Sequence, residues 1–116
     1  YDNDISEIES GTFIGLQALE KLKLQGNKLK MLTRKMFKNL KSLRQLNLAN
    51  NNISVTESDA FSDLQSLNSL LLHSNKLTNV TNGMFRNVSS LTKIDLAFNE
   101  ISIIEPRSFS NLKQCD

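Results

Sequence analysis

Few side chains in this sequence are of the kinds that carry out enzyme chemistry. The 116 residues include one histidine, His73, and one cysteine, Cys115, and the acidic residues follow no paired pattern. A catalytic nucleophile needs a base beside it, and a metal ion needs several His, Cys or carboxylate ligands, but the sequence suggests neither arrangement. No glycine-rich loop that would hold a phosphate is found in it. We therefore expect a protein that is not an enzyme, with no catalytic residues, no metal site and no cofactor.

Asparagine and phenylalanine, in contrast, recur at a fixed interval of 24 residues. The asparagines of this series are Asn3, Asn27, Asn51, Asn75 and Asn99. The phenylalanines are Phe13, Phe37, Phe61, Phe85 and Phe109. An amide side chain offers both donors and an acceptor, so a column of asparagines can satisfy backbone groups that a turn leaves unpaired. We expect a structural role for both series, an asparagine ladder and a column of buried rings.

Aliphatic residues surround each asparagine at the same interval. With Leu19 counted as position 1, leucine occupies positions 1, 4, 6, 11, 14 and 22 of the stretch from Leu19 to Ser42. The copies beginning at Leu43, Leu67 and Leu91 carry Leu, Ile or Val at these positions, except for Thr56. Such a period is typical of a solenoid, in which each copy buries its apolar face against its neighbours. The alternation at positions 4 and 6 predicts a short strand in each copy, with positions 3, 5 and 7 facing outward from a parallel sheet.

The run LxxLxLxxNxLxxLxxxxFxxLxx resembles the leucine-rich repeat in its 24-residue form, over about Ile5 to Leu112. The resemblance implies an α/β-type solenoid, a right-handed horseshoe with a parallel β-sheet on its concave face and mostly irregular convex loops. The repeat form is similar to that in ectodomains of animal cell-surface and secreted proteins, among them Toll-like receptors and variable lymphocyte receptors. It implies an extracellular recognition module with a role in immunity or cell adhesion.

The repeats account for the whole chain. We expect one solenoid segment over residues 1–116, with a partial repeat at 1–18, repeats at 19–42, 43–66, 67–90 and 91–114, and the start of another at 115–116. Neither end resembles the polar or disulfide-stapled caps of a solenoid, which favours a piece of a longer ectodomain. No apolar run approaches the roughly 18 residues of a membrane span. Cys115 either fills position 1 as a small buried side chain or begins a cysteine-bearing cap.

The outward strand positions are the candidates for contact with a partner. They carry mostly small and polar residues and one large aliphatic residue, Leu71, which Asn47 and Asp95 should flank on adjacent strands. Phe98 follows the next strand at position 8. An aliphatic and an aromatic side chain among polar neighbours resemble a small protein-binding hot spot, with incidental exposure as the alternative. The candidate ligand-binding residues are Lys21, Lys23, Gln25, Gln45, Asn47, Ser69, Leu71, His73, Lys93, Asp95 and Phe98.

The basic residues are concentrated in the first complete repeat. Nine of the 14 Lys and Arg residues lie between Lys21 and Arg44, although the formal net charge of the chain is only +2. A sulfated glycan or another polyanion is therefore a possible partner. A solvated surface is the simpler interpretation, because the lysines are spread around the repeat. The net charge is too small to indicate a nucleic acid.

Three N-x-S/T sequons favour an extracellular compartment. They are Asn52-Ile53-Ser54, Asn79-Val80-Thr81 and Asn87-Val88-Ser89. The three asparagines occupy variable positions of the repeat, numbers 10, 13 and 21, which we expect to face solvent and to tolerate a glycan. We predict glycosylation at Asn52, Asn79 and Asn87 and a secreted or cell-surface protein.

One framework position is polar. Position 14 of the second repeat is Thr56, and Val55 precedes it. A local shift of the loop would let Val55 fill the pocket in its place. Without that shift, the Thr56 hydroxyl needs a backbone hydrogen-bond partner, because an unpaired buried hydroxyl is costly.

Two functions fit these features. The first is a recognition module whose concave or lateral face binds a protein ligand or co-receptor through a few central contacts. The alternative is a structural spacer within an adhesion or matrix protein, which agrees with the small polar residues at most outward positions.

Overall fold

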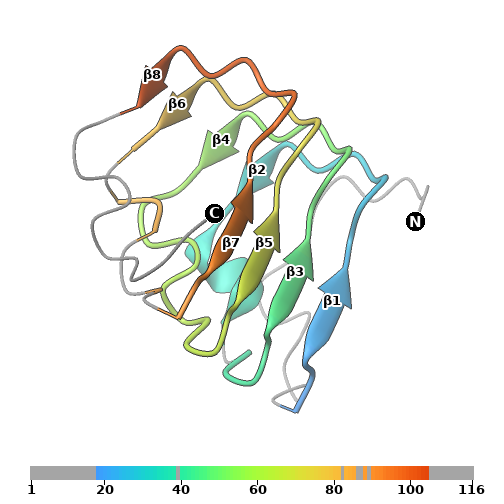
Figure 1. Ribbon diagram of the computed structural model, residues 1–116, viewed down its shortest axis with the longest axis vertical. Coiled ribbons are helices and arrows are strands. Elements are labelled where there is room, and N and C mark those ends of the chain that lie inside the picture. The colour runs from blue at the N-terminus through green and yellow to red at the C-terminus, as the bar shows by residue number, and fades with distance from the viewer. Residues whose placement is uncertain (1–17, 39, 82, 86–87, 89, 105–116) are drawn as a thin grey trace.

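Four short strands, one from each turn of the chain, form a parallel sheet (Figure 1). The computed structural model describes residues 18–38, 40–81, 83–85, 88 and 90–104. The strands of this main sheet are β1 (Lys21–Lys23), β3 (Gln45–Asn47), β5 (Ser69–Leu71) and β7 (Lys93–Asp95), paired in that order. Each strand residue pairs with the residue 24 positions further on, as Lys21 does with Gln45. The predicted solenoid with a parallel sheet is therefore confirmed.

The main sheet buries one of its faces, as the alternation of the strands predicts. Leu46 and Leu70 are paired on adjacent strands and are buried, and Leu22 and Ile94 are half-buried at the two ends of the same row. The residues on either side of this row face outward and are exposed or half-buried. The main sheet thus has one apolar face that packs inward and one polar face that is open to a partner.

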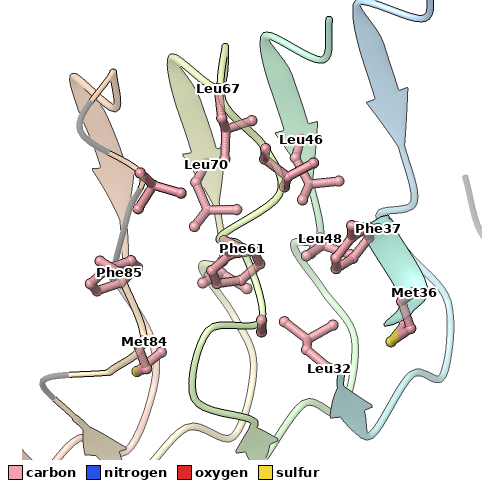
Figure 2. Packing of buried hydrophobic residues seen from close by; sticks show 14 of the residues in the cluster. Leu32, Met36, Phe37, Leu46, Leu48, Phe61, Leu67, Leu70, Met84 and Phe85 are labelled. Atoms are coloured by element: carbon pink, nitrogen blue, oxygen red, sulfur yellow. The ribbon is translucent and has the colours of Figure 1, made fainter. Parts of the chain in front are cut away.

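Stacked aromatic rings fill the space behind the main sheet (Figure 2). The ring centroids of Phe37 and Phe61 are 6.1 Å apart, and those of Phe61 and Phe85 are 6.3 Å apart. Offset or tilted pairs at such distances are favourable contacts between aromatic rings. All three rings are fully buried. Phe37 ends a short 3₁₀ helix, η1 (Arg34–Phe37), and Phe13 and Phe109 lie outside the described residues.

An asparagine at position 9 joins each turn to the one before it. The Asn75 amide nitrogen donates to the carbonyls of Leu72 in its own turn and of Leu48 in the preceding turn, both at 3.0 Å. Its oxygen accepts the Ile53 amide at 3.1 Å. Asn51 and Asn99 make the equivalent bonds, and Asn27 donates to the carbonyl of its own turn. Asn3 lies outside the described residues.

The residue before each of these asparagines has a left-handed backbone. At position 8, φ is 74° at Gly26, 55° at Asn50, 59° at Ser74 and 56° at Phe98. Glycine and asparagine adopt this conformation easily, whereas a bulky residue does so only at a cost. The chain turns out of the main sheet at this position in every turn, so the conformation is imposed by the repeat and not by the residue.

A second set of short parallel strands follows the asparagine turns, which the sequence pattern does not indicate. β2 (Met31–Leu32) pairs with β4 (Val55–Thr56), and β6 (Asn79–Val80) pairs with β8 (Ile103–Ile104). We call these two pairs the second sheets. Outside η1 and the strands, the described chain runs in turns and extended segments. This agrees with the mostly irregular convex loops that we expect. Among the described residues, no helix is long and apolar enough to cross a lipid bilayer.

The structure contradicts both interpretations of Thr56. Leu32 pairs with Thr56 and Met31 pairs with Val55, so the loop is not shifted and Val55 points outward. The Thr56 side-chain oxygen is buried, but it has no hydrogen-bond partner in the described part of the chain. The threonine therefore takes the place of an aliphatic residue and leaves its hydroxyl unpaired.

Replacing Thr56 with valine should stabilise the protein. Valine has nearly the same shape and removes the unpaired hydroxyl, so we expect the free energy of unfolding to rise by about 1 kcal/mol. Urea denaturation followed by circular dichroism measures this change. Thr78→Val is the control, because Thr78 is exposed and its replacement should change stability little. A Thr56→Val protein that is less stable than the wild type would show that the hydroxyl does find a partner in solution.

Asn75→Ala should destabilise the protein strongly. It removes the bonds to both carbonyls and leaves the buried Ile53 amide without an acceptor, so we expect a loss of about 2–4 kcal/mol. Asn52→Ala is a suitable control, because Asn52 is half-buried and is not part of the ladder. Equal stability of the two variants would contradict the role given to the ladder.

Candidate functional site

The outward face of the main sheet brings the predicted ligand-binding residues into rows. Position 3 of each turn forms one row and position 5 forms the next, because the four strands pair without a slip. The first row consists of Lys21, Gln45, Ser69 and Lys93. The second row consists of Lys23, Asn47, Leu71 and Asp95. Residues distant in sequence therefore lie side by side on one rigid surface.

Leu71 lies in the middle of the second row. It pairs with Asn47 on one side and with Asp95 on the other, as the sequence predicts. Both polar neighbours turn one oxygen toward the backbone: Asn47 accepts the Ala49 amide and Asp95 accepts the Ala97 amide, each at 3.1 Å. Leu71 itself is half-buried, and not fully exposed as an isolated surface leucine would be. The Leu71 side chain is thus only partly exposed, and it lies between two polar side chains whose orientation is fixed by hydrogen bonds to the backbone.

A small hollow of about 70 Å³ lies on this face beside Leu71. Its lining consists of Lys21, Leu22, Lys23, Gln45, Leu46, Asn47, Ser69 and Leu71. It is much smaller than pockets that enclose a drug-sized molecule, which occupy roughly 300–1,000 Å³. A side chain of a protein partner fits such a surface better than a small ligand does.

The residues at position 7 are less accessible. Gln25 and His73 are half-buried, and the His73 ring nitrogen Nδ1 lies 3.3 Å from the Ser74 hydroxyl. The Gln25 side-chain oxygen is buried without a hydrogen-bond partner in the described chain. The row at position 7 contains two alanines, Ala49 and Ala97, so it offers fewer side-chain contacts than the rows at positions 3 and 5.

Phe98 stands apart from the other candidates. Its side chain is 84% exposed, and its backbone is left-handed with φ at 56°. A left-handed backbone costs roughly 1–2 kcal/mol for an ordinary residue, and a bulky residue in this region is unusual. The sequence indicated Phe98 as a candidate because its side chain is aromatic. The only sequence signal for its left-handed backbone is that Gly26 and Asn50, which adopt this conformation easily, occupy position 8 of the first two complete repeats. Because the Phe98 backbone is strained and its ring is exposed, we expect this residue to contribute little to the stability of the fold.

A second hollow lies where the strands of the main sheet begin, and it was not predicted. It measures about 560 Å³ and is lined by Ala18, Glu20, Ser42, Arg44, Ser66, Asn68 and Ser90. A signal for it was present in the sequence, because serine recurs at position 24 of three consecutive repeats. The Ser90 hydroxyl donates to the Leu67 carbonyl at 2.7 Å, so at least this member of the serine series forms a hydrogen bond with the backbone.

The basic residues of the first complete repeat lie around the whole turn. Lys21 and Lys23 are on the main sheet, and Lys30 precedes the second sheet. Arg34 lies on the 3₁₀ helix, where its guanidinium pairs with the Asp63 carboxylate at 3.3 Å. All nine side chains are exposed, but they do not gather on one face of the molecule.

The structure describes two of the three sequon asparagines. Asn79 is exposed on β6, and Asn52 is half-buried in the turn before β4. Asn87 and Cys115 lie outside the described residues. In the part of the chain that is described, no group of His, Cys, Asp and Glu side chains could hold a metal ion.

The fold and this surface define a solenoid scaffold that presents side chains on an open sheet. A family model described as leucine rich repeat matches residues 1–53, 19–77 and 65–115, and the chain belongs to the leucine-rich repeat family. No curated protein matches the chain. Leucine-rich repeats generally mediate recognition between proteins and are typically not enzymes.

Exchanging the residues at position 8 should move stability in opposite directions. Phe98→Asn should raise the free energy of unfolding by about 1 kcal/mol, because asparagine tolerates the left-handed backbone. Asn50→Phe is the reciprocal variant and should lower it by a similar amount. Thermal denaturation of both variants provides the comparison. If Phe98→Asn lowers stability, the aromatic ring makes a stabilising contact within the chain, and the interpretation of its exposure is wrong.

Proposed function

We propose that this chain is part of an extracellular receptor ectodomain whose main sheet binds a protein ligand or co-receptor. The observation that carries the proposal is the row of Asn47, Leu71 and Asp95, with Phe98 exposed near the end of the next strand. The row offers an apolar contact between groups that can form hydrogen bonds. Binding energy at protein interfaces is concentrated in such centres, with polar contacts around them.

Rigidity supports this assignment. The strands that carry the row are held by continuous pairing, and the asparagine ladder fixes the turn that follows each strand. A rigid surface loses little conformational entropy when it binds. Little of the binding free energy is therefore lost in ordering this face.

The strain at Phe98 also favours a binding role. Gly26, Asn50 and Ser74 occupy the same left-handed position in the other described turns, and each is smaller and less strained there than phenylalanine. Exposed strain is expected where a residue serves a partner and not the fold. The aromatic ring provides a large contact area with few rotatable bonds.

The extracellular location rests on the repeat form and on the sequons. The 24-residue repeat resembles those of Toll-like receptors, variable lymphocyte receptors, adhesion proteins and matrix proteins. The exposed position of Asn79 is compatible with a glycan. Within this group, we favour an innate-immune receptor of Toll-like or similar type, because this is the commonest setting for long series of such repeats.

Two other functions fit less well. A structural spacer would need no apolar contact in the middle of the main sheet and no strained aromatic residue beside it. A polyanion such as a sulfated glycan would require a cationic face, whereas the basic residues between Lys21 and Arg44 are distributed around the turn. Protein recognition is the function that uses Leu71 and Phe98 together.

The double variant Leu71→Glu and Phe98→Glu should abolish partner binding. The experiment displays the chain as a multivalent probe on an array of purified secreted and cell-surface proteins, and then measures the affinity of each binder. We expect an affinity loss of about tenfold or more, because charges replace both apolar contacts.

Ser58→Glu with Gln65→Glu is the matched control, since it adds the same charge at exposed positions outside the main sheet. This control should retain the wild-type affinity. Binders whose affinity is unchanged by the Leu71 and Phe98 substitutions, or an array without binders, would favour the spacer.

A further inference from the structure

The outward side of the second sheets carries a row of exposed apolar residues. Met31, Val55 and Ile103 occupy position 13 of their turns and are 49%, 47% and 55% exposed. Asn79 occupies the same position on β6 and pairs with Ile103, while Met31 pairs with Val55. Single exposed apolar residues are ordinary, but Met31 and Val55 lie side by side on successive turns and form a small apolar patch, and Ile103 lies beyond Asn79. The sequon asparagine Asn79 is the polar member of this row.

The second sheets are separated from each other beside Asn79. The Lys30 carbonyl accepts the Ser54 amide at 3.0 Å, and the Thr78 carbonyl accepts the Ser102 amide at 2.8 Å. The corresponding bond from the Thr78 amide to the Ser54 carbonyl is missing within the described chain, and β4 does not pair with β6. Backbone pairing therefore joins β2 to β4 and β6 to β8, but it does not join β4 to β6 (Figure 1).

An open pocket of about 320 Å³ occupies this separation. Its lining consists of Ser54, Val55, Thr56, Leu77, Thr78, Asn79, Thr81 and Met84. Four of these residues carry hydroxyl groups, and the Thr56 hydroxyl is buried without a hydrogen-bond partner in the described chain. Val55, Leu77 and Met84 add apolar surface. A sugar ring presents both kinds of surface, because its hydroxyls form hydrogen bonds and its C–H groups pack against aliphatic side chains.

We propose that Asn79 carries an N-linked glycan whose first sugar lies in this pocket and covers Val55. The proposal rests on the extracellular location proposed above and deepens it, because it gives the glycan a structural position. The occupant is covalently tethered to a residue that lines the pocket, so its local concentration is high and even weak contacts are populated.

The modification itself is a transfer of an oligosaccharide from a lipid diphosphate donor. The Asn79 side-chain nitrogen forms a bond to C1 of the first N-acetylglucosamine, and the bond between C1 and the diphosphate oxygen breaks. The lipid diphosphate leaves with the electron pair of that bond, and one proton of the amide nitrogen passes to a base of the transferase. Thr81 supplies the hydroxyl residue of the sequon.

Asn79 suits this role better than Asn52. Asn79 is exposed and lies on a strand with the pocket beside it, whereas Asn52 is half-buried and lies outside the pocket lining. A glycan on Asn52 would therefore not be held by the pocket in the same way. This difference provides an internal control.

The test uses the full chain secreted from glycosylating cells with an added export signal. Intact mass of the wild type and of Asn79→Gln shows whether Asn79 is modified. The binding of an apolar fluorescent dye and the melting temperature are then measured for the wild type, for Asn79→Gln and for wild type trimmed to one N-acetylglucosamine. Thr81→Ser keeps the sequon, and Asn52→Gln removes the other described sequon.

We expect Asn79→Gln to bind at least about twofold more dye, because Val55 and the aliphatic lining of the pocket become accessible. Its melting temperature should fall by about 3 °C. The trimmed protein, Thr81→Ser and Asn52→Gln should behave like the wild type. In nuclear magnetic resonance spectra, the methyl groups of Val55 should show cross-peaks to the first sugar.

Two results would overturn the proposal. One is a secreted protein without a glycan on Asn79. The other is a glycan on Asn79 that changes neither dye binding nor the Val55 spectra, which would place it in solvent. Neither result bears on the main sheet, because partner binding there is tested by Leu71 and Phe98, and Asn79→Gln should leave that binding unchanged.

Discussion

The bond between an asparagine amide and the carbonyls of two successive turns is the interaction on which this structure depends. Asn51 donates to Leu24 in the preceding turn and to Leu48 in its own turn. This fixes how far one turn is displaced from the next. The pairing of the main sheet and the stacking of the phenylalanine rings both require that same displacement. Since each turn contacts mainly its neighbours, the bond must be repeated in every turn to hold the solenoid together.

Repetition of the framework leaves only the outward positions free to differ. On the main sheet these positions carry Lys, Gln, Ser and Asp around Leu71, and on the second sheets they carry Met31, Val55 and Ile103 with Asn79. The two surfaces therefore have different chemistry although they belong to the same turns. The protein partner proposed for the first surface and the glycan proposed for the second would not compete for space, because the two surfaces lie on different strands of each turn.

Departures from the repeat mark the places where the fold does not set the residue type. Phe98 adopts the left-handed backbone that the turn imposes, although glycine or asparagine would do so at lower cost. Thr56 occupies an aliphatic position beside the separation between β4 and β6, and its hydroxyl has no hydrogen-bond partner among the described residues. We expect both residues to reduce stability, and each lies at one of the two surfaces proposed to contact another group. Residues that depart from the repeat are expected at binding surfaces, because binding and not packing then determines the residue type.

The sequence by itself determined the solenoid, its 24-residue step, the strands of the main sheet and their buried face, because each of these repeats the same neighbour contacts in every turn. It also placed Asn47, Leu71 and Asp95 side by side. The tertiary structure alone decided that Leu71 is half-buried, that Phe98 is strained, that position 13 lies on a second set of strands and that β4 and β6 are apart. The physical reason is that these features depend on backbone conformation and backbone hydrogen bonds at positions where the residue type varies, so the apolar pattern of the framework does not encode them.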